Sequence, residues 1–366
     1  MTLMTAVRAH RGEEKLRLEQ IPVPEPGPGD VLVKVAAAGL APSMMKLLAR
    51  GAFTHLPTTP GHEIAGTVVA VGSADDASLT GRRVRVHPML SCRSCVYCRT
   101  DREQMCAETA MIGHAAFGTG PLRLYAEYHD GGLADYVRVP RWLVDPLPDT
   151  VSFEVGAKVH DLANAVRALK CAALPLGGTL VVTAATGTMG VSTVKLARFF
   201  GAARLVLVGR SADRLADVRA LAGSLPADTV ALSELGEDWE TTGALTRRLH
   251  ELVPRGADAA VDFLPGGAGT GQTAAALATG GTLVHMGGNH APFPFPMREV
   301  MHACWRFIGT RACTRVDTAA VLDLLGSGAL RADDLITHRF PLTQVNEAVT
   351  LMLSRDEPMW MGVVTP

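Results

Sequence analysis

The fold of this 366-residue chain is decided by Thr183-Ala-Ala-Thr-Gly-Thr-Met-Gly190, a short turn that follows an apolar run and precedes a predicted helix over 191–200. The turn matches a dinucleotide fingerprint, with glycine at the second and third positions and alanine at the first. Small residues let the backbone approach a pyrophosphate, whose charge is stabilised by the N–H groups of the helix start. The predicted cofactor-binding residues of this turn are Ala185, Thr186, Gly187, Thr188, Met189 and Gly190.

Strands and helices alternate on both sides of this turn. Apolar runs at 180–183, 205–208, 259–262 and 282–286 are predicted strands, and the Ala- and Leu-rich stretch 212–221 is a predicted helix. Such alternation is typical of a parallel sheet with helices on both faces. The middle of the chain is therefore predicted to be a doubly wound α/β domain.

The end of the second strand indicates which dinucleotide binds. An acidic residue there would bind the ribose 2′-hydroxyl of NAD, but the chain has Gly209 followed by Arg210, with Arg214 soon after. Guanidinium groups pair with phosphate, so NADP(H) is the predicted cofactor. The alternative is that both arginines are solvated residues at a helix start. Gly287 and Asn289 follow the strand at 282–286 and are further candidates for contact with the cofactor.

Four of the seven cysteines lie within fifteen residues, at Cys92, Cys95, Cys98 and Cys106. Structural zinc sites prefer four thiolates in tetrahedral geometry, and two-residue spacers allow neighbouring sulfurs to reach one ion. A site with four thiolates has no open position for substrate, so we predict one structural Zn²⁺ per chain in a lobe at about 90–108. The other cysteines are predicted to be core residues.

Composition narrows the class of protein. Hydrophobic residues make up 48% of the chain and its formal net charge is −1, which supplies no basic field for a nucleic acid or an anionic membrane. The N-terminal stretch lacks the apolar region of a signal peptide, and no run is long enough to span a membrane. We therefore expect a cytoplasmic protein that acts on a small molecule.

The first 150 residues are predicted to be β-rich, and the tail to hold a helix at 318–326 and a strand at 361–364.

With these features the chain resembles the medium-chain dehydrogenase/reductase superfamily, which includes the zinc alcohol dehydrogenases. The motifs that carry the resemblance are Pro60-Gly-His-Glu-Ile-Ala-Gly66, the cysteine lobe, Asp130-Gly-Gly-Leu-Ala-Asp-Tyr-Val137 and the dinucleotide turn. The resemblance implies a GroES-like catalytic domain at 1–155 and 309–366, with a Rossmann domain at 156–308. It also implies a homodimer formed through the edge of the Rossmann sheet, and an active site where the two domains meet.

The zinc alcohol dehydrogenases of this superfamily hold a second, catalytic zinc, and the match to its ligands is partial. The first ligand, a cysteine, corresponds to Ala41, whereas His62 and Glu63 match the Gly-His-Glu motif. The third ligand corresponds to His160, with Asp161 beside it. Loss of the thiolate leaves imidazole or carboxylate to take over its role.

Two further positions bear on the chemistry that the resemblance implies. Ser43 corresponds to the residue that relays the alcohol proton in the zinc enzymes, and Met44 replaces an acidic residue near the zinc. Without the zinc, we expect His62, Glu63, His160 and Asp161 to form a polar cluster that orients the substrate or donates a proton. With zinc, His62, Glu63 and His160 would be its ligands. A third interpretation treats His62 as a structural histidine and His160 as a residue at a helix start.

Hydride transfer without a Lewis acid suits the reduction of an activated alkene, because hydrogen-bond donors can hold the enolate while an acid protonates carbon. The sequence hence predicts an NADP(H)-dependent reductase of a small enone, enal or carbonyl. The alternatives are a zinc alcohol dehydrogenase with an unusual ligand set, and a non-catalytic NADPH-binding sensor or partner protein. The stretch 115–129, which contains Tyr125, Tyr128 and His129, is longer than the family usually has, and we interpret this stretch as the lip of a substrate cleft or as a solvated surface loop.

Overall fold

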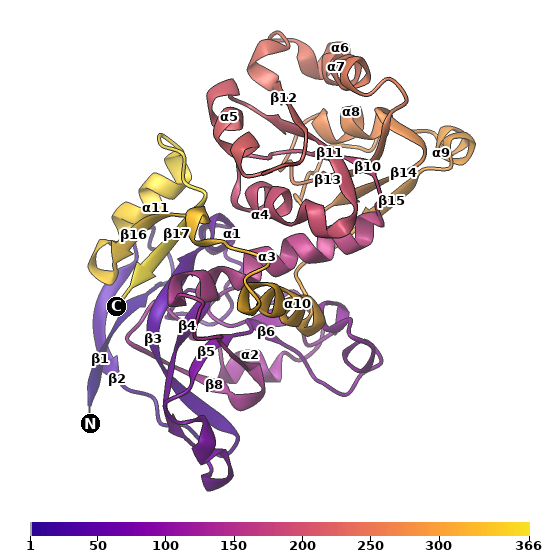
Figure 1. Ribbon diagram of the computed structural model, residues 1–366. Helices are drawn as coiled ribbons and strands as arrows, with labels where there is room; N and C mark the ends of the chain where they lie inside the picture. Colours follow the sequence, from indigo (N-terminus) through magenta and orange to yellow (C-terminus); the bar gives the residue numbers. More distant parts are fainter. Residues whose placement is uncertain (1) are drawn as a thin grey trace. The chain divides into compact units, whose positions relative to one another are not determined.

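The computed structural model describes residues 2–366, and the chain divides into two units. The first unit combines residues 1–160 with 314–366, and the second holds 161–313. These divisions fall a few residues beyond the domain bounds expected from the sequence. Figure 1 shows the elements of each unit with their labels.

The second unit contains one six-stranded sheet in which every strand pair is parallel. Its strands, in spatial order, are β12 (Ala227–Ala231), β11 (Ala202–Gly209), β10 (Gly178–Val182), β13 (Ala257–Asp262), β14 (Leu277–His285) and β15 (Arg306–Gly309). The chain adds strands on one side of β10 and then on the other. The order therefore reverses between β10 and β13, which is where doubly wound sheets bind ligands outside their carboxyl ends.

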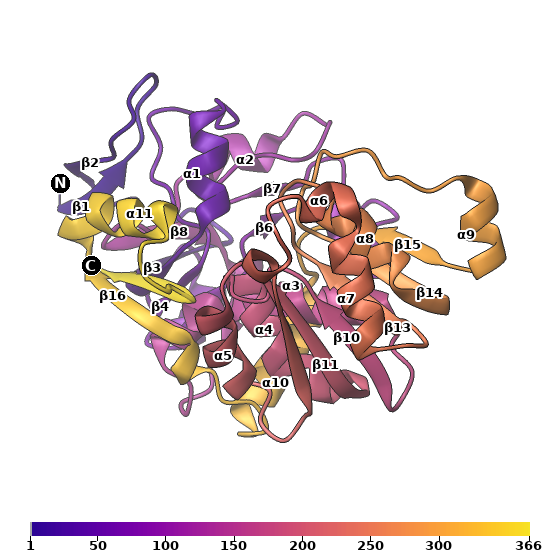
Figure 2. The same cartoon turned by 90° about the horizontal axis from the view of Figure 1, so that it is seen from above.

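Both faces of this sheet are covered by helices, as expected from the sequence. Val206 and Val208 of β11 pack in one core cluster with Leu245 of α7, while their neighbours Leu205 and Leu207 are fully buried on the opposite face. Figure 2 shows α4 and α5 on one side of the strands and α7 and α8 on the other. The helices are α4 (Thr188–Leu196), α5 (Ala212–Ala220), α6 (Trp239–Thr242), α7 (Ala244–Leu252), α8 (Gly269–Ala275) and α9 (Met297–Ala303).

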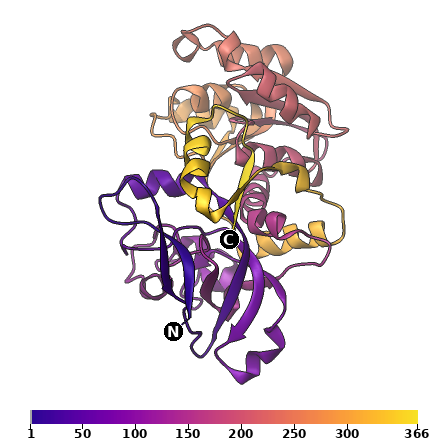
Figure 3. The same cartoon turned by 90° about the vertical axis from the view of Figure 1, so that its left-hand side faces the viewer.

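The first unit is built around a sheet of seven strands. Its central strand β3 (Asp30–Leu40) pairs with β4 (Ile64–Val71), β8 (Tyr136–Pro140) and the C-terminal strand β17 (Met361–Thr365). Figure 3 shows the yellow C-terminal segment beside the indigo and purple strands. Both ends of the chain thus form one sheet, as the resemblance implied. The remaining strands of this unit are β1 (Leu3–Arg8), β2 (Arg17–Pro22), β5 (Arg83–Val86), β6 (Met89–Leu90), β7 (Ala110–Met111), β9 (Val144–Pro146) and β16 (Ile336–Pro341).

Helix α3 (Phe153–Ala172) begins directly after Ser152, whose side-chain oxygen accepts a hydrogen bond from the N–H of Val155 and so caps the helix start. His160 lies in the interior of α3, so its interpretation as a residue at a helix start was wrong. The other helices of the first unit are α1 (Pro42–Ala49), α2 (Arg123–Glu127), α10 (Arg315–Gly326) and α11 (Val345–Ser354). Among residues 2–366, no helix has the length and apolar character needed to cross a membrane.

Element bounds differ from the sequence prediction in a few places. The helix predicted over 191–200 begins earlier, at Thr188, and its last residues form a 3₁₀ turn at Ala197–Phe200. Strands β12 and β15 were not predicted. Each contains only four or five residues, and such short runs give little periodic signal.

Candidate functional site

The fingerprint turn joins β10 to α4 at the carboxyl edge of the parallel sheet. A Cβ atom on Gly190 would lie 2.5 Å from Ala185 Cα, so only glycine allows the helix to pack this closely. Gly187 precedes the first residue of α4, and a Cβ there would meet nothing nearer than 3.5 Å. This geometry leaves the start of α4 open to a phosphate group, as the dinucleotide interpretation requires.

The end of β11 lies next to this turn. A Cβ on Gly209 would lie 3.3 Å from Thr186 Cγ2, which places the carboxyl ends of β10 and β11 side by side. Arg210 is exposed immediately beyond Gly209, and Arg214 is half-buried in the first turn of α5. Both guanidinium groups are therefore on elements that leave the edge of the sheet where a dinucleotide binds.

The four predicted zinc ligands come together in the first unit. All four cysteine sulfurs lie within 4.8 Å of one another, and Cys95 Sγ is 3.6 Å from Cys98 Sγ. Backbone N–H groups point at these sulfurs: Cys95 N–H donates to Cys92 Sγ over 3.3 Å, and Glu108 N–H donates to Cys106 Sγ over 3.4 Å. Sulfurs that converge and accept amide hydrogen bonds fit a structural zinc ion well.

Hydrogen bonds and burial shift the pKa values of these thiols in opposite directions. The backbone N–H of Ser94 lowers the pKa of Cys92 to about 6, whereas burial raises the pKa of Cys98 to about 12 and also raises that of Cys106. A divalent cation deprotonates the thiols that coordinate it. A bound cation would therefore have to overcome the effect of burial on Cys98 and Cys106.

A crossing of three glycines positions the imidazole side chains of the other predicted site. Gly61 N–H donates to Gly113 O over 2.8 Å, and a Cβ on Gly113 would lie 2.6 Å from Gly131 Cα. Gly61 and Gly113 both have positive φ, at 104° and 60°. Only glycine permits this close approach. His62 and His114 each follow one of these glycines, and the crossing brings their side chains together.

Three buried imidazole rings form the centre of this site, which we call the imidazole cluster (His62, His114 and His160). The ring centroids of His62 and His114 are 4.5 Å apart, and those of His62 and His160 are 5.1 Å apart. His114 Nε2 lies 3.3 Å from the exposed hydroxyl of Ser43, at the start of α1. The Nδ1 atoms of His62 and His114 are buried and have no hydrogen-bond partner in the described part of the chain.

Burial keeps these rings neutral. It is the largest cause that lowers the pKa of His62 to about 3, and the charges of Lys158 and Arg85 lower it further. Burial also lowers the pKa values of His114 and His160 well below 6.5, with His62 as the next cause in each case. At neutral pH each ring therefore offers one N–H donor and one acceptor nitrogen.

Glu63 is committed to an ion pair. Its carboxylate lies 2.5 Å from Lys158 Nζ, and both side chains are almost completely buried. Lys158 Nζ also donates to Leu40 O over 3.3 Å. A Cβ on Gly39 would lie 2.0 Å from Glu63 Oε2, so the pair occupies the space that a side chain at position 39 would need.

The residues that the resemblance aligns with the family's catalytic zinc lack part of its ligand set. Buried Ala41 offers no ligand atom, and Glu63 Oε2 is paired with Lys158, while Glu63 Oε1 has no hydrogen-bond partner in the described chain and lies 3.8 Å from His62 Nε2. Across residues 2–366, the four cysteines are the one group of at least three His, Cys, Asp or Glu whose ligand atoms converge within 4.8 Å. Metal-binding histidines almost always donate their second ring N–H to a partner. His62 Nδ1 has none, and buried Met44 stands where the zinc enzymes have an acid.

Several outcomes concern residues outside the predicted ligand set. Tyr125 and Tyr128, within the stretch at 115–129, are buried, and their hydroxyls donate to His114 O and to Asp30 Oδ1. The interpretation of that stretch as a cleft lip or a solvated loop stays a prediction. Asp161 follows His160 in α3 and is buried. Neither His114 nor Lys158 was predicted from the sequence as a site residue. The Gly-His pair at 113–114, which repeats the Gly-His pair at 61–62, was the available signal for His114.

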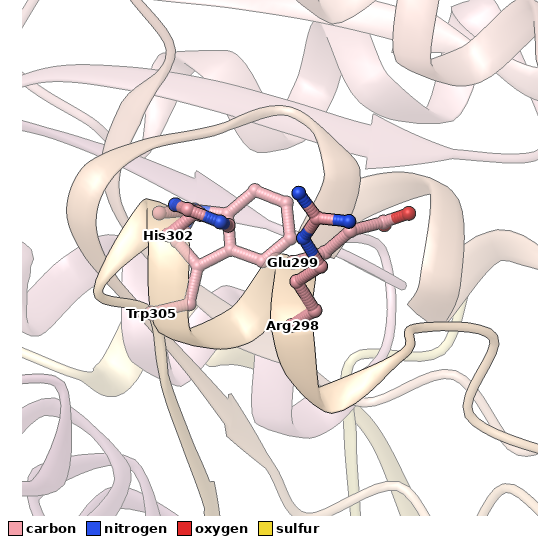
Figure 4. Close-up of a pocket in the computed structure, with 5 residues that line it drawn as sticks. Arg298, Glu299, His302 and Trp305 are labelled. Carbon is pink, nitrogen blue, oxygen red and sulfur yellow. The ribbon is translucent and has the colours of Figure 1, made fainter.

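A surface hollow of about 560 Å³ lies on α9 and is distinct from the predicted site residues. Figure 4 shows Arg298, Glu299, His302 and Trp305 lining it. These side chains come from α9 and from the residue before β15, so the hollow is a feature of the helix surface.

The chain is similar to known oxidoreductases over almost its full length. Residues 27–149 match the alcohol dehydrogenase GroES-like domain, and residues 188–327 match the zinc-binding dehydrogenase family. A sorbitol dehydrogenase of Bombyx mori is 29% identical over 349 residues, which cover 94% of each chain. A D-xylulose reductase A of Aspergillus clavatus is 30% identical, over 92% of this chain and 90% of the relative.

A solved structure shows the same arrangement. A zinc-binding dehydrogenase of Sinorhizobium meliloti 1021, determined with NADP bound, superposes with a TM-score of 0.83 at 26% identity over the full length of both chains. The fold and the dinucleotide turn define an NAD(P)-dependent oxidoreductase. The chain belongs to the medium-chain dehydrogenase/reductase superfamily, in its zinc-dependent alcohol dehydrogenase-like branch.

Proposed function

We propose that this protein is an NADP(H)-dependent reductase that transfers hydride to a small activated alkene, of the enone or enal type, or to a carbonyl, without a catalytic zinc. One observation carries the proposal: His62 and His114 are two adjacent neutral imidazoles whose Nδ1 atoms have no partner in the described chain, and His62 is the residue that the resemblance aligns with a ligand of the catalytic zinc. Buried polar atoms without a partner are costly, so such atoms mark a place where a ligand binds.

The imidazole cluster supplies hydrogen bonds in place of a metal charge. A neutral imidazole N–H can donate to a carbonyl or enolate oxygen, and a preorganised donor in a dry site stabilises developing negative charge. His62 and His114 would hold the substrate oxygen in this way. Their low pKa values keep them neutral, so they act as donors that do not lose a proton to the substrate.

Ser43 is the proposed proton donor of the site. Its hydroxyl is exposed and lies 3.3 Å from His114 Nε2, which fixes its orientation. Bound NADPH supplies the hydride. When hydride adds to the β-carbon of an enone, the oxygen becomes an enolate held by the imidazoles. The exposed Ser43 hydroxyl then passes its proton to the α-carbon and takes up a proton from solvent in its place. With a carbonyl substrate, the oxygen takes that proton instead.

Metal analysis and turnover test this proposal together. Purified protein is expected to contain one zinc per chain and to oxidise NADPH with members of a panel of enals, enones and aldehydes. The Ser43→Ala and His114→Phe variants are expected to keep that zinc and lose about tenfold or more in kcat. Unchanged turnover in both variants would remove the cluster from the reaction.

A zinc alcohol dehydrogenase is the second candidate, because the relatives are named for sorbitol and D-xylulose, an alcohol and a ketone. It would use His62, Glu63 and His160 as ligands, and Glu63 would have to leave Lys158. Two zinc ions per chain, one of them lost in a His62→Ala variant, would favour it. A non-catalytic NADPH-binding protein would bind cofactor tightly and turn over no member of the panel.

The preference for NADP(H) is proposed from Arg210 and Arg214, which lie beyond the end of β11, where Gly209 takes the place of an acid. Loss of one charge-assisted contact with the 2′-phosphate costs about 1.5–3 kcal/mol. The Arg210→Ala variant is therefore expected to bind NADPH at least about tenfold more weakly and NADH unchanged. Arg219→Ala, at the far end of α5, is the matched control, and equal NADPH and NADH affinities in the wild-type protein would contradict the assignment.

We also propose that the protein is a cytoplasmic homodimer that pairs through β15. This strand ends the parallel sheet, and the adjacent α9 carries the exposed side chains of Met297 and Met301. An open strand edge beside exposed apolar residues is suited to pairing with a second copy. Light scattering of the purified protein measures the assembly state directly.

A further inference from the structure

A hydrogen-bonded network outside the imidazole cluster lies at the carboxyl edge of the parallel sheet. Thr183 follows β10, Asp262 ends β13 and His285 ends β14. The carboxyl ends of these three adjacent strands flank the point where the strand order reverses. The residues proposed to bind the adenosine half of the dinucleotide follow β10 and β11. The nicotinamide half is therefore expected on the side of β13 and β14.

The carboxylate of Asp262 is fully buried and accepts three hydrogen bonds. Thr183 Oγ1 donates to its Oδ1, while Thr270 Oγ1 donates to Oδ2 over 2.8 Å and His285 Nδ1 donates to Oδ2 over 2.6 Å. Thr183 Oγ1 itself accepts the N–H of Phe263 over 3.1 Å, so its hydroxyl proton is free to point at Asp262. The buried charge is thus stabilised by donors from three elements.

The tautomer of His285 follows from its second contact. The backbone N–H of Asn289 donates to His285 Nε2 over 3.0 Å. A backbone N–H cannot accept a hydrogen bond, so Nε2 carries a lone pair and Nδ1 carries the proton. This is the tautomer that Asp262 requires. The ring therefore links a buried carboxylate to the backbone of the loop at 286–289.

That loop is held tightly in place. Gly288 has φ +74°, and a Cβ on Gly287 would lie 2.4 Å from Leu264 O. Asn289 Nδ2 donates to Gly267 O over 2.9 Å and to Thr270 Oγ1 over 2.8 Å. The same Thr270 hydroxyl donates to Asp262, which closes the network.

We propose that Asp262 and His285 form a positioning pair that fixes the loop at 286–289 against the nicotinamide half of the cofactor. The inference rests on the proposed dinucleotide-dependent reduction and names residues that neither the fingerprint nor the imidazole cluster includes. His285 acts through the backbone of Asn289, and Asp262 acts by holding the proton of His285 on Nδ1. Neither side chain takes part in proton transfer to substrate.

The test separates the two halves of the cofactor. His285→Phe keeps the ring and removes both hydrogen bonds, and is expected to weaken NADPH binding and to lower kcat, each by about tenfold. Binding of 2′,5′-ADP, which carries the adenosine half without nicotinamide, is expected to change by less than about twofold. His285→Gln, whose amide supplies one donor and one acceptor, is expected to restore most of the NADPH affinity. His250→Phe, at an exposed position of α7, is the control.

Thr270→Val is the second variant if His285→Phe does not fold, because it removes one hydroxyl at constant shape. It is expected to weaken NADPH binding less than His285→Phe does, again with little change in 2′,5′-ADP binding. Equal weakening of NADPH and 2′,5′-ADP would show a general structural role and overturn the proposal, as would unchanged binding of both. NADPH affinity, read by its fluorescence on binding, needs no substrate. A protein that binds NADPH but reduces no member of the panel would refute the proposed function and leave this test intact.

Discussion

The cysteine lobe and the imidazole cluster are two regions of one unit, and each corresponds to a zinc site of the family. In the lobe all four ligands are present, their sulfurs converge and amide N–H groups point at them. In the cluster one ligand is replaced by Ala41, an adjacent acid is replaced by Met44, and Glu63 is neutralised by Lys158. A metal site therefore depends on its ligands and on the groups around them, and here both have changed together.

The largest effect is expected where the metal stabilises the fold. Cys95→Ser should remove the bound zinc and lower the free energy of unfolding by more than about 4 kcal/mol, because loss of a structural metal is among the most destabilising single changes. Zinc content and urea unfolding measure both quantities.

Two matched variants sharpen this contrast between the regions. Cys304→Ser, at an exposed cysteine, should change neither zinc content nor stability. His62→Ala should keep the single zinc. Loss of zinc in the His62 variant would show that the two regions are more alike than their geometry indicates.

The next effect concerns the buried ion pair. Lys158→Met removes the partner of a completely buried carboxylate and should cost about 3 kcal/mol of stability, measured by urea unfolding. The double variant with Glu63→Gln should regain part of this loss, because it removes the uncompensated charge. Lys170→Met, at an exposed position of the same helix, is the control. Additive losses in the double variant would mean that the two side chains are not coupled.

The smallest effect, per residue and per pH unit, is the pH dependence of stability that each histidine of the imidazole cluster contributes. The folded protein holds the pKa of His62 at about 3, below the unfolded value of 6.5, so the unfolded state binds more protons between these limits. Stability should therefore fall as pH drops below 6.5, by up to about 1.4 kcal/mol per pH unit for each such histidine.

His114→Phe isolates one histidine in this pH dependence. It should reduce the slope of stability against pH by the contribution of a single group, because burial lowers the pKa of His114 as well. Urea unfolding at several pH values between 7 and 5 measures the slope. Zinc content measured in the same samples separates proton uptake by the cluster from release of the lobe's metal. An unchanged slope in the variant would show that folding does not lower the pKa of His114.

Much of the fold could be predicted because its signals are local. The fingerprint glycines, the apolar strands and the cysteine spacing each lie within one short stretch of sequence. His114 and Lys158 could not be predicted in the same way, because their roles arise from contacts between segments far apart in the chain: Gly61 with Gly113, and Glu63 with Lys158. Strand β15 is recognisable mainly by the sheet edge that it completes.

The glycine crossing at Gly61, Gly113 and Gly131 fixes the backbone, and so the position of a side chain there does not depend on the identity of that side chain. Since the backbone path is fixed by glycine contacts, the residues that follow Gly61 and Gly113 reach the same location whatever their identity. A single codon change at position 114 could therefore exchange a hydrogen-bond donor for an acid, a thiol or an apolar group without remodelling the scaffold. Such a backbone allows one fold to acquire different reaction chemistries in small evolutionary steps.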